Sequence, residues 1–352
     1  MDNLLASKQA SKQASKQARI EYIDLFRAFG IILMIMGHIK FGSQFDKWIH
    51  AFHMPMFFFV SAYFYRSKDD VSVGPQVMKK AKSLLLPYIV FELVQWLVLL
   101  PFVPEYRNIQ TLIYILTENT YKIPVESGTF GISPIPGAMW FLTAIFFIEA
   151  IYIVLDKALK NDWKLHVAVV VLVILGMISP TFLPFRLPWA LDASFVGIGF
   201  FHIARMIHGL KVEKLLNLKV WQAIIVGAVF SVLIKICPKI NMRTGNYGWY
   251  LPFWINALGA IVASWNLSRY ADVFLKLWIG AVGSWLKNIG KNSIVYLCLN
   301  QIVILGATKI LSVIGIRGIL AKLLILILTM GILFFFEKLI CNTMLKVIIG
   351  KQ

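Results

Sequence analysis

Long apolar stretches separated by short polar segments dominate the chain and predict a bundle of membrane-spanning helices. A membrane helix needs about 20 consecutive, mostly apolar residues. Residues 269–288 are less apolar and predict a helix at the membrane interface instead. Ten stretches have the length of a span, at 22–40, 48–65, 83–101, 138–156, 166–183, 189–207, 220–237, 249–266, 290–312 and 318–340. We therefore expect an all-α, polytopic transmembrane helical bundle of about ten spans.

The distribution of basic residues predicts the orientation of this bundle. With the N-terminus placed inside, Lys and Arg are roughly twice as frequent on the inside segments as on the outside ones. An even number of spans then puts both the N- and the C-terminus in the cytoplasm. The net charge of +18 would suggest nucleic acid in a soluble protein, but here the charges follow the spans. We expect membrane lipids as partners and no nucleic acid.

Composition supports the membrane class. Hydrophobic residues make up 59% of the chain and charged residues 15%, whereas soluble domains have about 45–50% and 25%. The three cysteines, Cys237, Cys298 and Cys341, sit in or beside apolar runs without pair spacing. They are expected to be small core residues, neither a disulfide framework nor a metal site.

The polar positions also predict the division of the chain. Residues 1–19 form a polar cytosolic tail, residues 20–345 the membrane domain, and residues 102–137 an outer loop whose aromatic residues favour a packed lid. The tail repeats Ser-Lys-Gln-Ala three times over residues 7–18. One interpretation is a solvated leader. The other is a translated AGCA tetranucleotide tract, which slips during replication and would make the gene phase-variable.

Three ionisable residues share one face of the first predicted span. Arg27 and His38 are eleven residues apart, about 20° more than three full helical turns, and Asp24 falls within roughly 40° of His38. Each such group costs about 2.5–3.5 kcal/mol in hydrocarbon, so it usually faces a cavity or the bundle interior. The stripe predicts chemistry, or transport of a polar solute, inside the membrane.

Other polar residues within spans are candidates by the same reasoning. His50 and His53 are three residues apart but lack a third ligand at useful spacing, so no metal is expected. The remaining polar residues are Glu92, Glu149, Asp192, His202, Asn256, Asn300 and Gln301.

Several motifs, in order along the chain, resemble the acyltransferase type 3 family of integral membrane acyltransferases. They lie at residues 19–28, 37–38, 52–64, 79–88, 140–142 and 289–293. The motif at 52–64 most resembles the sugar O-acetylase branch of this family, although Ala62 stands where that branch usually has a Gly after Ser61. Many members have a His where this chain has Asn300, which cannot shuttle protons near neutral pH.

The resemblance implies a membrane O-acetyltransferase that moves acetyl from cytoplasmic acetyl-CoA to a hydroxyl of a surface glycan or lipid-linked sugar. His38 is the expected catalytic base, because imidazole titrates near operating pH, and Asp24, Arg27 and His53 would support it. Arg27, Lys79, Lys80 and Lys82 would bind the CoA phosphates, although topology alone also accounts for the lysines. The expected acceptor-side residues are Trp140, Glu149, Asp192 and Asn300.

Other interpretations remain open for the same residues. His38 could be a hydrogen-bonded core histidine, and Asp24–Arg27 a structural ion pair. A glycan or small-solute transporter or flippase would also use ten spans and buried acids, but it predicts inverted repeats, and the Asp24–His38 stripe has no counterpart in the second half. A binding module without turnover is the third class. Together with the phase-variation hypothesis, the resemblance favours a multi-pass protein of the bacterial inner membrane that modifies lipopolysaccharide or capsule.

Overall fold

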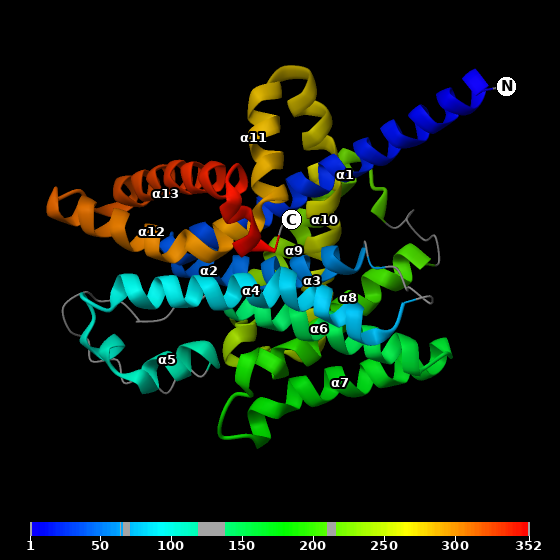
Figure 1. Ribbon diagram of the computed structural model, residues 1–352. Coiled ribbons are helices and arrows are strands. Elements are labelled where there is room, and N and C mark those ends of the chain that lie inside the picture. Colours follow the sequence, from blue (N-terminus) through cyan, green and yellow to red (C-terminus); the bar gives the residue numbers. More distant parts are fainter. Residues whose placement is uncertain (1, 64, 66–70, 119–137, 210–215, 351–352) are drawn as a thin grey trace.

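The computed structural model describes residues 2–63, 65, 71–118, 138–209 and 216–350, and the regular structure in these residues is helical apart from one isolated bridge between Asn241 and Asn246. The prediction of an all-α protein is confirmed. Figure 1 shows the arrangement of the α-helices, which are α1 (Asp2–Ile39), α2 (Ser43–His50), α3 (His53–Tyr63), α4 (Val73–Leu99), α5 (Ile109–Leu116), α6 (Trp140–Ala158), α7 (Asp162–Phe182), α8 (Leu191–Gly209), α9 (Val220–Ile236), α10 (Tyr250–Trp278), α11 (Gly280–Lys291), α12 (Ser293–Val313) and α13 (Gly318–Cys341). Within the described residues, 3-10 helices lie between or after them, η1 (Pro104–Arg107), η3 (Pro188–Ala190), η5 (Met242–Thr244) and η6 (Met344–Ile349).

Six helical segments among the described residues are long and apolar enough to cross a membrane. They are Glu21–Ile39 within α1, α4, α7, Pro188–His208 around α8, α12 and α13. α9, with 17 residues, is apolar but shorter. The chain is therefore a multi-pass membrane protein by length and composition, whereas the count of ten spans and the side on which the termini lie stay predictions.

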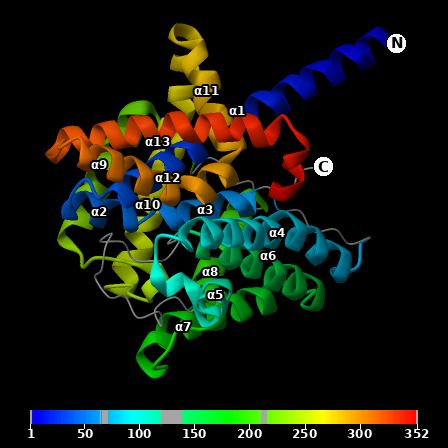
Figure 2. The ribbon, with the colours of Figure 1, turned by 60° about the vertical axis from the view of Figure 1, so that its left-hand side comes forward.

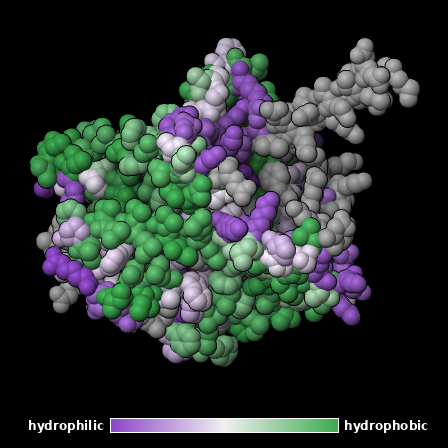
Figure 3. Space-filling model, viewed as in Figure 1, coloured by the Kyte–Doolittle hydropathy of each residue, from purple (hydrophilic) through white to green (hydrophobic). Residues whose placement is uncertain are grey.

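The exposed apolar surface is also that of a membrane protein. Figure 3 shows apolar residues covering most of one face, over α4, α12 and α13, while hydrophilic residues gather near α11. Along α13, large apolar side chains are exposed over the whole length, from Ile319 and Leu320 to Phe335 and Leu339. A soluble monomer rarely exposes so large an apolar area, whereas lipid covers it in a membrane.

Two helices form the centre of the molecule. α1 packs against α3, α10, α11 and α12. In α3 every residue except Ser61 is buried, as expected of a helix that is apolar on all sides. The prediction of one span over 48–65 is wrong, because the chain turns at Ala51-Phe52 and divides this stretch into α2 and α3. Pro55 lies in the first turn of α3, where its missing N–H leaves no helical hydrogen bond unmade.

The polar segment after the eighth predicted span also differs from expectation. The predicted span at 249–266 and the first half of the predicted helix at 269–288 are instead one 29-residue helix, α10, and the second half belongs to α11, which follows directly. Figures 1 and 2 both show α11 and the adjoining end of α10 projecting from the body, close to α1. Ion pairs of Lys276 and Lys287 with Glu21 and Asp272, at 2.8–2.9 Å, attach this hairpin to α1. They account for a helix that continues beyond the apolar pattern.

Candidate functional site

A cavity of about 250 Å³ lies at the C-terminal end of α1, and His38 lines it. We call it the His38 cavity. α1, α2, α3, α6, η5 and α12 converge here, so residues distant in sequence meet in one place. The lining residues are Met34, His38, His50, His53, Met54, Ala138, Trp140, Asn241, Met242, Arg243 and Gln301.

The three histidines of this cavity are held differently. The Nδ1 atom of His38 lies 3.1 Å from Nε2 of Gln301 on α12. His53 and His50 instead place Nδ1 at 2.8 and 2.6 Å from the carbonyl oxygens of Ile49 and Asp46, four residues earlier. His38 is therefore the member of the set whose ring is oriented by a side chain from another helix.

A second, larger cavity of about 510 Å³ adjoins the first. We call it the Arg186 cavity. Trp140, Asn241 and Arg243 line both cavities. The residues that line the larger one alone are Glu118, Pro180, Leu183, Pro184, Phe185, Arg186, Leu187, Ala190, Asp192 and Thr244. Because the two hollows share a wall, one bound molecule can extend from the Arg186 cavity towards His38.

The Arg186 cavity contains two acids and two arginines. Arg186 forms an ion pair with Asp192 at 2.7 Å, whereas Arg243 is 3.7 Å from Glu118, beyond hydrogen-bond distance. Burial raises the pKa of Glu118 from 4.5 to about 7, against the opposing charge of Arg243. Glu118 follows α5 and lies outside the candidate spans, so its carboxyl exchanges protons near neutral pH.

A third cavity, of about 260 Å³, surrounds Arg27 nearer the N-terminal end of α1. We call it the Arg27 cavity. Arg27 is 3.5 Å from Asp24, so the predicted pair exists. The other lining residues are Ile31, Phe57, Val60, Ser61, Leu84, Phe141, Leu142, Ile145, Gly290, Lys291, Asn292, Ser293, Ile294, Leu297 and Ile349. Arg27 and Lys291 make this the cationic cavity.

The Gly-Lys-Asn-Ser motif at 290–293 forms one wall of the Arg27 cavity. Gly290 packs on the backbone of Asp24 so closely that a Cβ at this position would overlap the Asp24 carbonyl group. The amide of Asn292 donates to Glu337 on α13, as does that of Asn288. The turn between α11 and α12 is thus fixed from two sides, which holds Lys291 and Ser293 at the cavity.

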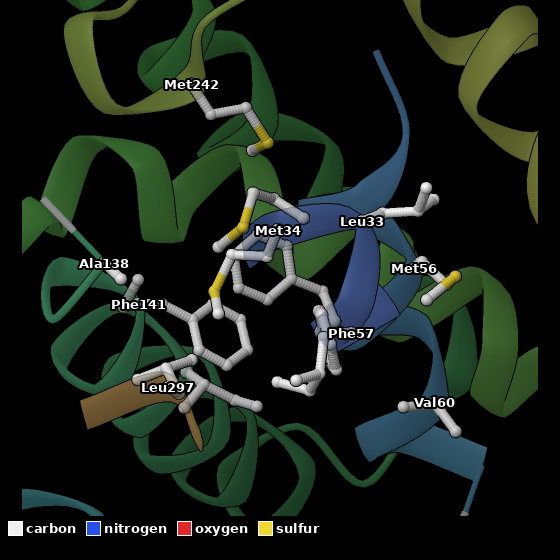
Figure 4. Packing of buried hydrophobic residues seen from close by; sticks show 14 of the residues in the cluster. Leu33, Met34, Met56, Phe57, Val60, Ala138, Phe141, Met242 and Leu297 are labelled. Atoms are coloured by element: carbon white, nitrogen blue, oxygen red, sulfur yellow. The ribbon is translucent and has the colours of Figure 1, made fainter. Parts of the chain in front are cut away.

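Buried apolar side chains lie between the Arg27 cavity and the His38 cavity. Met34 lines the His38 cavity, and Phe57, Phe141 and Leu297 line the Arg27 cavity. Figure 4 shows Met242 and Met34 on one side of this packing and Leu297 and Val60 on the other. The side chains that line the two cavities here, Met34, Phe57, Phe141 and Leu297, are each at most 6% exposed. We call Met34, Phe57, Phe141 and Leu297 the apolar layer.

The structure brings most of the predicted site residues to these cavities. His38, His53 and Trp140 line the His38 cavity, Asp192 lines the Arg186 cavity, and Arg27 lines the third. Their roles stay predictions. Among the described residues, no group of three His, Cys, Asp or Glu side chains has the spacing of a metal site.

Other predicted site residues lie elsewhere. Lys80 pairs with Glu149 at 2.9 Å, so this expected acceptor-side acid contacts an expected cofactor-side lysine and lines none of the three cavities. Lys79 and Lys82 are exposed on α4. Asn300 is fully buried, and its amide donates to Tyr296 and Leu297 of its own helix. Most of the predicted lid, residues 119–137, lies outside the described residues.

Sequence reasoning missed three charged residues that the structure places at the cavities, Glu118, Arg186 and Arg243, and it gave no role to Gln301, which it listed only as a polar residue within a span. Gln301 carried a signal, as an amide inside a span next to Asn300. Arg186 and Arg243 appeared only as basic residues of outer segments. Nothing in the local sequence connects Glu118 to Arg243, because they are 125 positions apart in two connecting segments.

Comparison with known proteins gives one result. The sequence profile of a protein family described as an acyltransferase domain matches residues 20–338. No curated protein and no solved structure matches the chain significantly. The matched region contains α1 from residue 20 onwards and all three cavities except Ile349.

Proposed function

The chain belongs to the acyltransferase type 3 family of membrane proteins, and from this membership and the three cavities we propose that it transfers an acetyl group from acetyl-CoA to a hydroxyl of a cell-surface glycan. The observation that carries the proposal is the placement of Arg27 and His38 in two cavities along one helix, on opposite sides of the apolar layer. They are about 16 Å apart by helical rise. The cationic site proposed for the donor and the imidazole proposed to act on the acceptor therefore lie at different depths along α1.

The donor would approach through the Arg27 cavity. Coenzyme A carries phosphates, and a guanidinium held by Asp24 presents a fixed fork to such a group. Lys291 lines the same cavity, and Lys79 and Lys82 are exposed on α4, where they can contact phosphates outside the cavity. The proposal places these residues on the cytoplasmic side. The pantetheine arm would extend past the apolar layer and bring the thioester to His38.

The chemistry at His38 depends on the state of its ring. Gln301 reaches Nδ1, so Nε2 is the nitrogen that can serve the reactants. In the structure the amide nitrogen of Gln301 donates to Nδ1, which leaves the ring proton on Nε2. A base at Nε2 therefore requires the other tautomer, with the Gln301 amide flipped so that its oxygen accepts from Nδ1–H. In that state Nε2 carries a lone pair and accepts the proton of the acceptor hydroxyl. The hydroxyl oxygen then bonds to the thioester carbon, the C–S bond breaks, and the coenzyme A thiolate takes the proton back from Nε2. The products are the acetyl ester and free coenzyme A.

The acceptor side would be outside, where both the His38 cavity and the Arg186 cavity lie in the predicted orientation. A lipopolysaccharide or capsule type of acceptor, a bacterial inner-membrane location and phase-variable expression all belong to this proposal. Membership in an acyltransferase family and an imidazole lining a 250 Å³ cavity support it over a solute transporter.

The test is an assay of the full chain in proteoliposomes with labelled acetyl-CoA and the non-acetylated glycan purified from cells that lack the gene. We expect label in the glycan and release of coenzyme A thiol in equal amounts, and neither with His38→Ala. The matched control is His166→Gln, since His166 lines none of the three cavities. Transfer that survives His38→Ala would overturn the catalytic assignment. A glycan that fails to reach the surface of deletion cells would favour transport instead.

A further inference from the structure

Two charged side chains of the Arg186 cavity have unused hydrogen-bonding atoms. Both carboxylate oxygens of Glu118, and Nε and Nη1 of Arg186, are buried and have no hydrogen-bond partner among the residues that the structure describes. Burying such atoms without partners destabilises the folded protein, because each loses its hydrogen bonds to water. Because both residues line the 510 Å³ cavity, a ligand in it can supply the missing partners.

The backbone around this cavity is strained. Of the four described non-glycine residues with positive φ, Glu118 (56°) and Ala190 (55°) line the cavity, and Trp189 (56°) directly precedes Ala190. Two hydrogen bonds join Trp189 to the residues just before Glu118, from its backbone N–H to the carbonyl oxygen of Thr117 and from its indole N–H to that of Leu116. Strained backbone persists where the surroundings enforce it, and it clusters at binding sites. Glu118 combines this strain with a place in the cavity lining.

The charges of the cavity indicate the chemistry of the ligand. When Glu118 is ionised, Glu118 and Asp192 balance Arg186 and Arg243, and when it is protonated its carboxyl donates as well as accepts, so in both states the cavity offers donors and acceptors together. A hydroxyl group both donates and accepts, which matches this arrangement, whereas a carboxylate or phosphate group would face two acids. Trp140, shared with the His38 cavity, adds an apolar surface for a ring.

We infer that the Arg186 cavity binds an uncharged, hydroxyl-rich sugar unit of the acceptor, with Glu118 and Arg186 as the residues that determine specificity. The inference rests on the proposed function and assigns the acceptor site within it. The sugar lies against Trp140 and Arg243, and one of its hydroxyls extends into the His38 cavity. A volume of 510 Å³ is within the usual range of small-molecule sites.

The kinetic test uses the proteoliposome assay with Glu118→Gln and Arg186→Gln. A site built to hydrogen-bond hydroxyls loses much of its affinity when one partner is changed. We expect the KM for the glycan to rise about tenfold or more in each variant, with the KM for acetyl-CoA unchanged. The control is Arg107→Gln, an exposed arginine of η1 that lines none of the three cavities. Wild-type KM values in both cavity variants would overturn the inference.

A binding measurement identifies the class of sugar. Saturation-transfer NMR on the detergent-solubilised full chain, with neutral methyl hexosides and with the matching methyl uronide, should show contact for a neutral sugar that Glu118→Gln weakens. Preferential contact of the uronide would overturn the assignment to an uncharged unit. Failure of the proposed function looks different, because wild type would then transfer no label and release no thiol from acetyl-CoA under any condition.

Discussion

At the scale of single residues, the orientation of His38 depends on one amide from the far end of the chain. Gln301 is 263 positions away, and its side chain reaches Nδ1 of the imidazole. Because Gln301 contacts Nδ1, the other ring nitrogen, Nε2, is the one left for a ligand in the cavity. The proposed role of His38 as a base therefore depends on which way the Gln301 amide is turned.

Replacing Gln301 by Ala should lower kcat for acetyl transfer by about tenfold or more while leaving the KM for acetyl-CoA unchanged, because a wrongly oriented base costs catalysis rather than donor binding. Steady-state kinetics in proteoliposomes measure both constants. Gln110→Ala, an exposed glutamine of α5, is the control. A rise in the KM for acetyl-CoA alone would contradict this role for Gln301.

Glu118 should make stability depend on pH. Its folded pKa of about 7 is above its ordinary 4.5, so its contribution to stability is complete below about pH 4.5 and is lost as pH rises through about 7. We expect the melting temperature of the wild type to fall more than that of Glu118→Gln between about pH 5 and pH 8. Thermal unfolding followed by tryptophan fluorescence measures the difference. Identical pH profiles would show that Glu118 titrates normally.

Sequence reasoning at this scale succeeded where residues lie on one element. Asp24, Arg27 and His38 share α1, so helical periodicity alone places them on one face, and the structure puts Arg27 and His38 in cavities. It failed for Glu118 and Arg243, because their proximity depends on how η5 and the end of α5 come together. No local pattern encodes such a contact.

At the scale of elements, the close packing of α11 on α1 positions the Arg27 cavity. Gly290 permits it, since its missing side chain leaves room for the backbone of Asp24. The division of residues 48–65 into α2 and α3 belongs to the same scale. Continuous apolar sequence predicts one span, and a turn within it becomes possible because surrounding helices bury α3 on all sides.

Gly290→Ala should destabilise the protein markedly, because the added methyl group would overlap the Asp24 carbonyl and push α11 away from α1. Gly306→Ala on α12 is the matched control, since nothing lies within 4 Å of the position of its added Cβ. There the change should be neutral or stabilise by about 0.5–1 kcal/mol. Size-exclusion chromatography of heated samples compares the two variants. Equal stability would show that the α1–α11 contact adapts easily.

At the scale of the whole molecule, the proposed reaction requires that the Arg27 cavity and the His38 cavity open towards opposite sides of the membrane. The excess of Lys and Arg on one set of connecting segments predicts which side is the cytoplasm. In the part of the chain that the structure describes, six helical segments meet the length and composition of a span. The shorter helices α3 and α9 show why sequence alone does not fix the number of crossings.

Site-directed labelling tests the orientation. In a variant whose three cysteines are replaced by Ala, Arg317→Cys should react with a membrane-impermeant maleimide on intact cells, whereas Lys160→Cys should react only after lysis. Both positions are exposed and precede a helix, α13 and α7 respectively. The cysteine-free variant serves as control. The opposite labelling pattern would invert the topology and, with it, the sides assigned to donor and acceptor.

The apolar layer also bears on the ion permeability of the membrane in which the protein lies. If water connected the Arg27 cavity and the His38 cavity, ions could leak across the membrane and dissipate its ion gradients. Met34, Phe57, Phe141 and Leu297 prevent this, because a hydrated ion cannot shed its water there without a penalty of several kcal/mol. A slender, weakly polar arm faces no such penalty and needs only rotation of flexible methionine and aromatic side chains. If the proposed reaction takes place, the same four residues would let the pantetheine arm pass and still exclude ions.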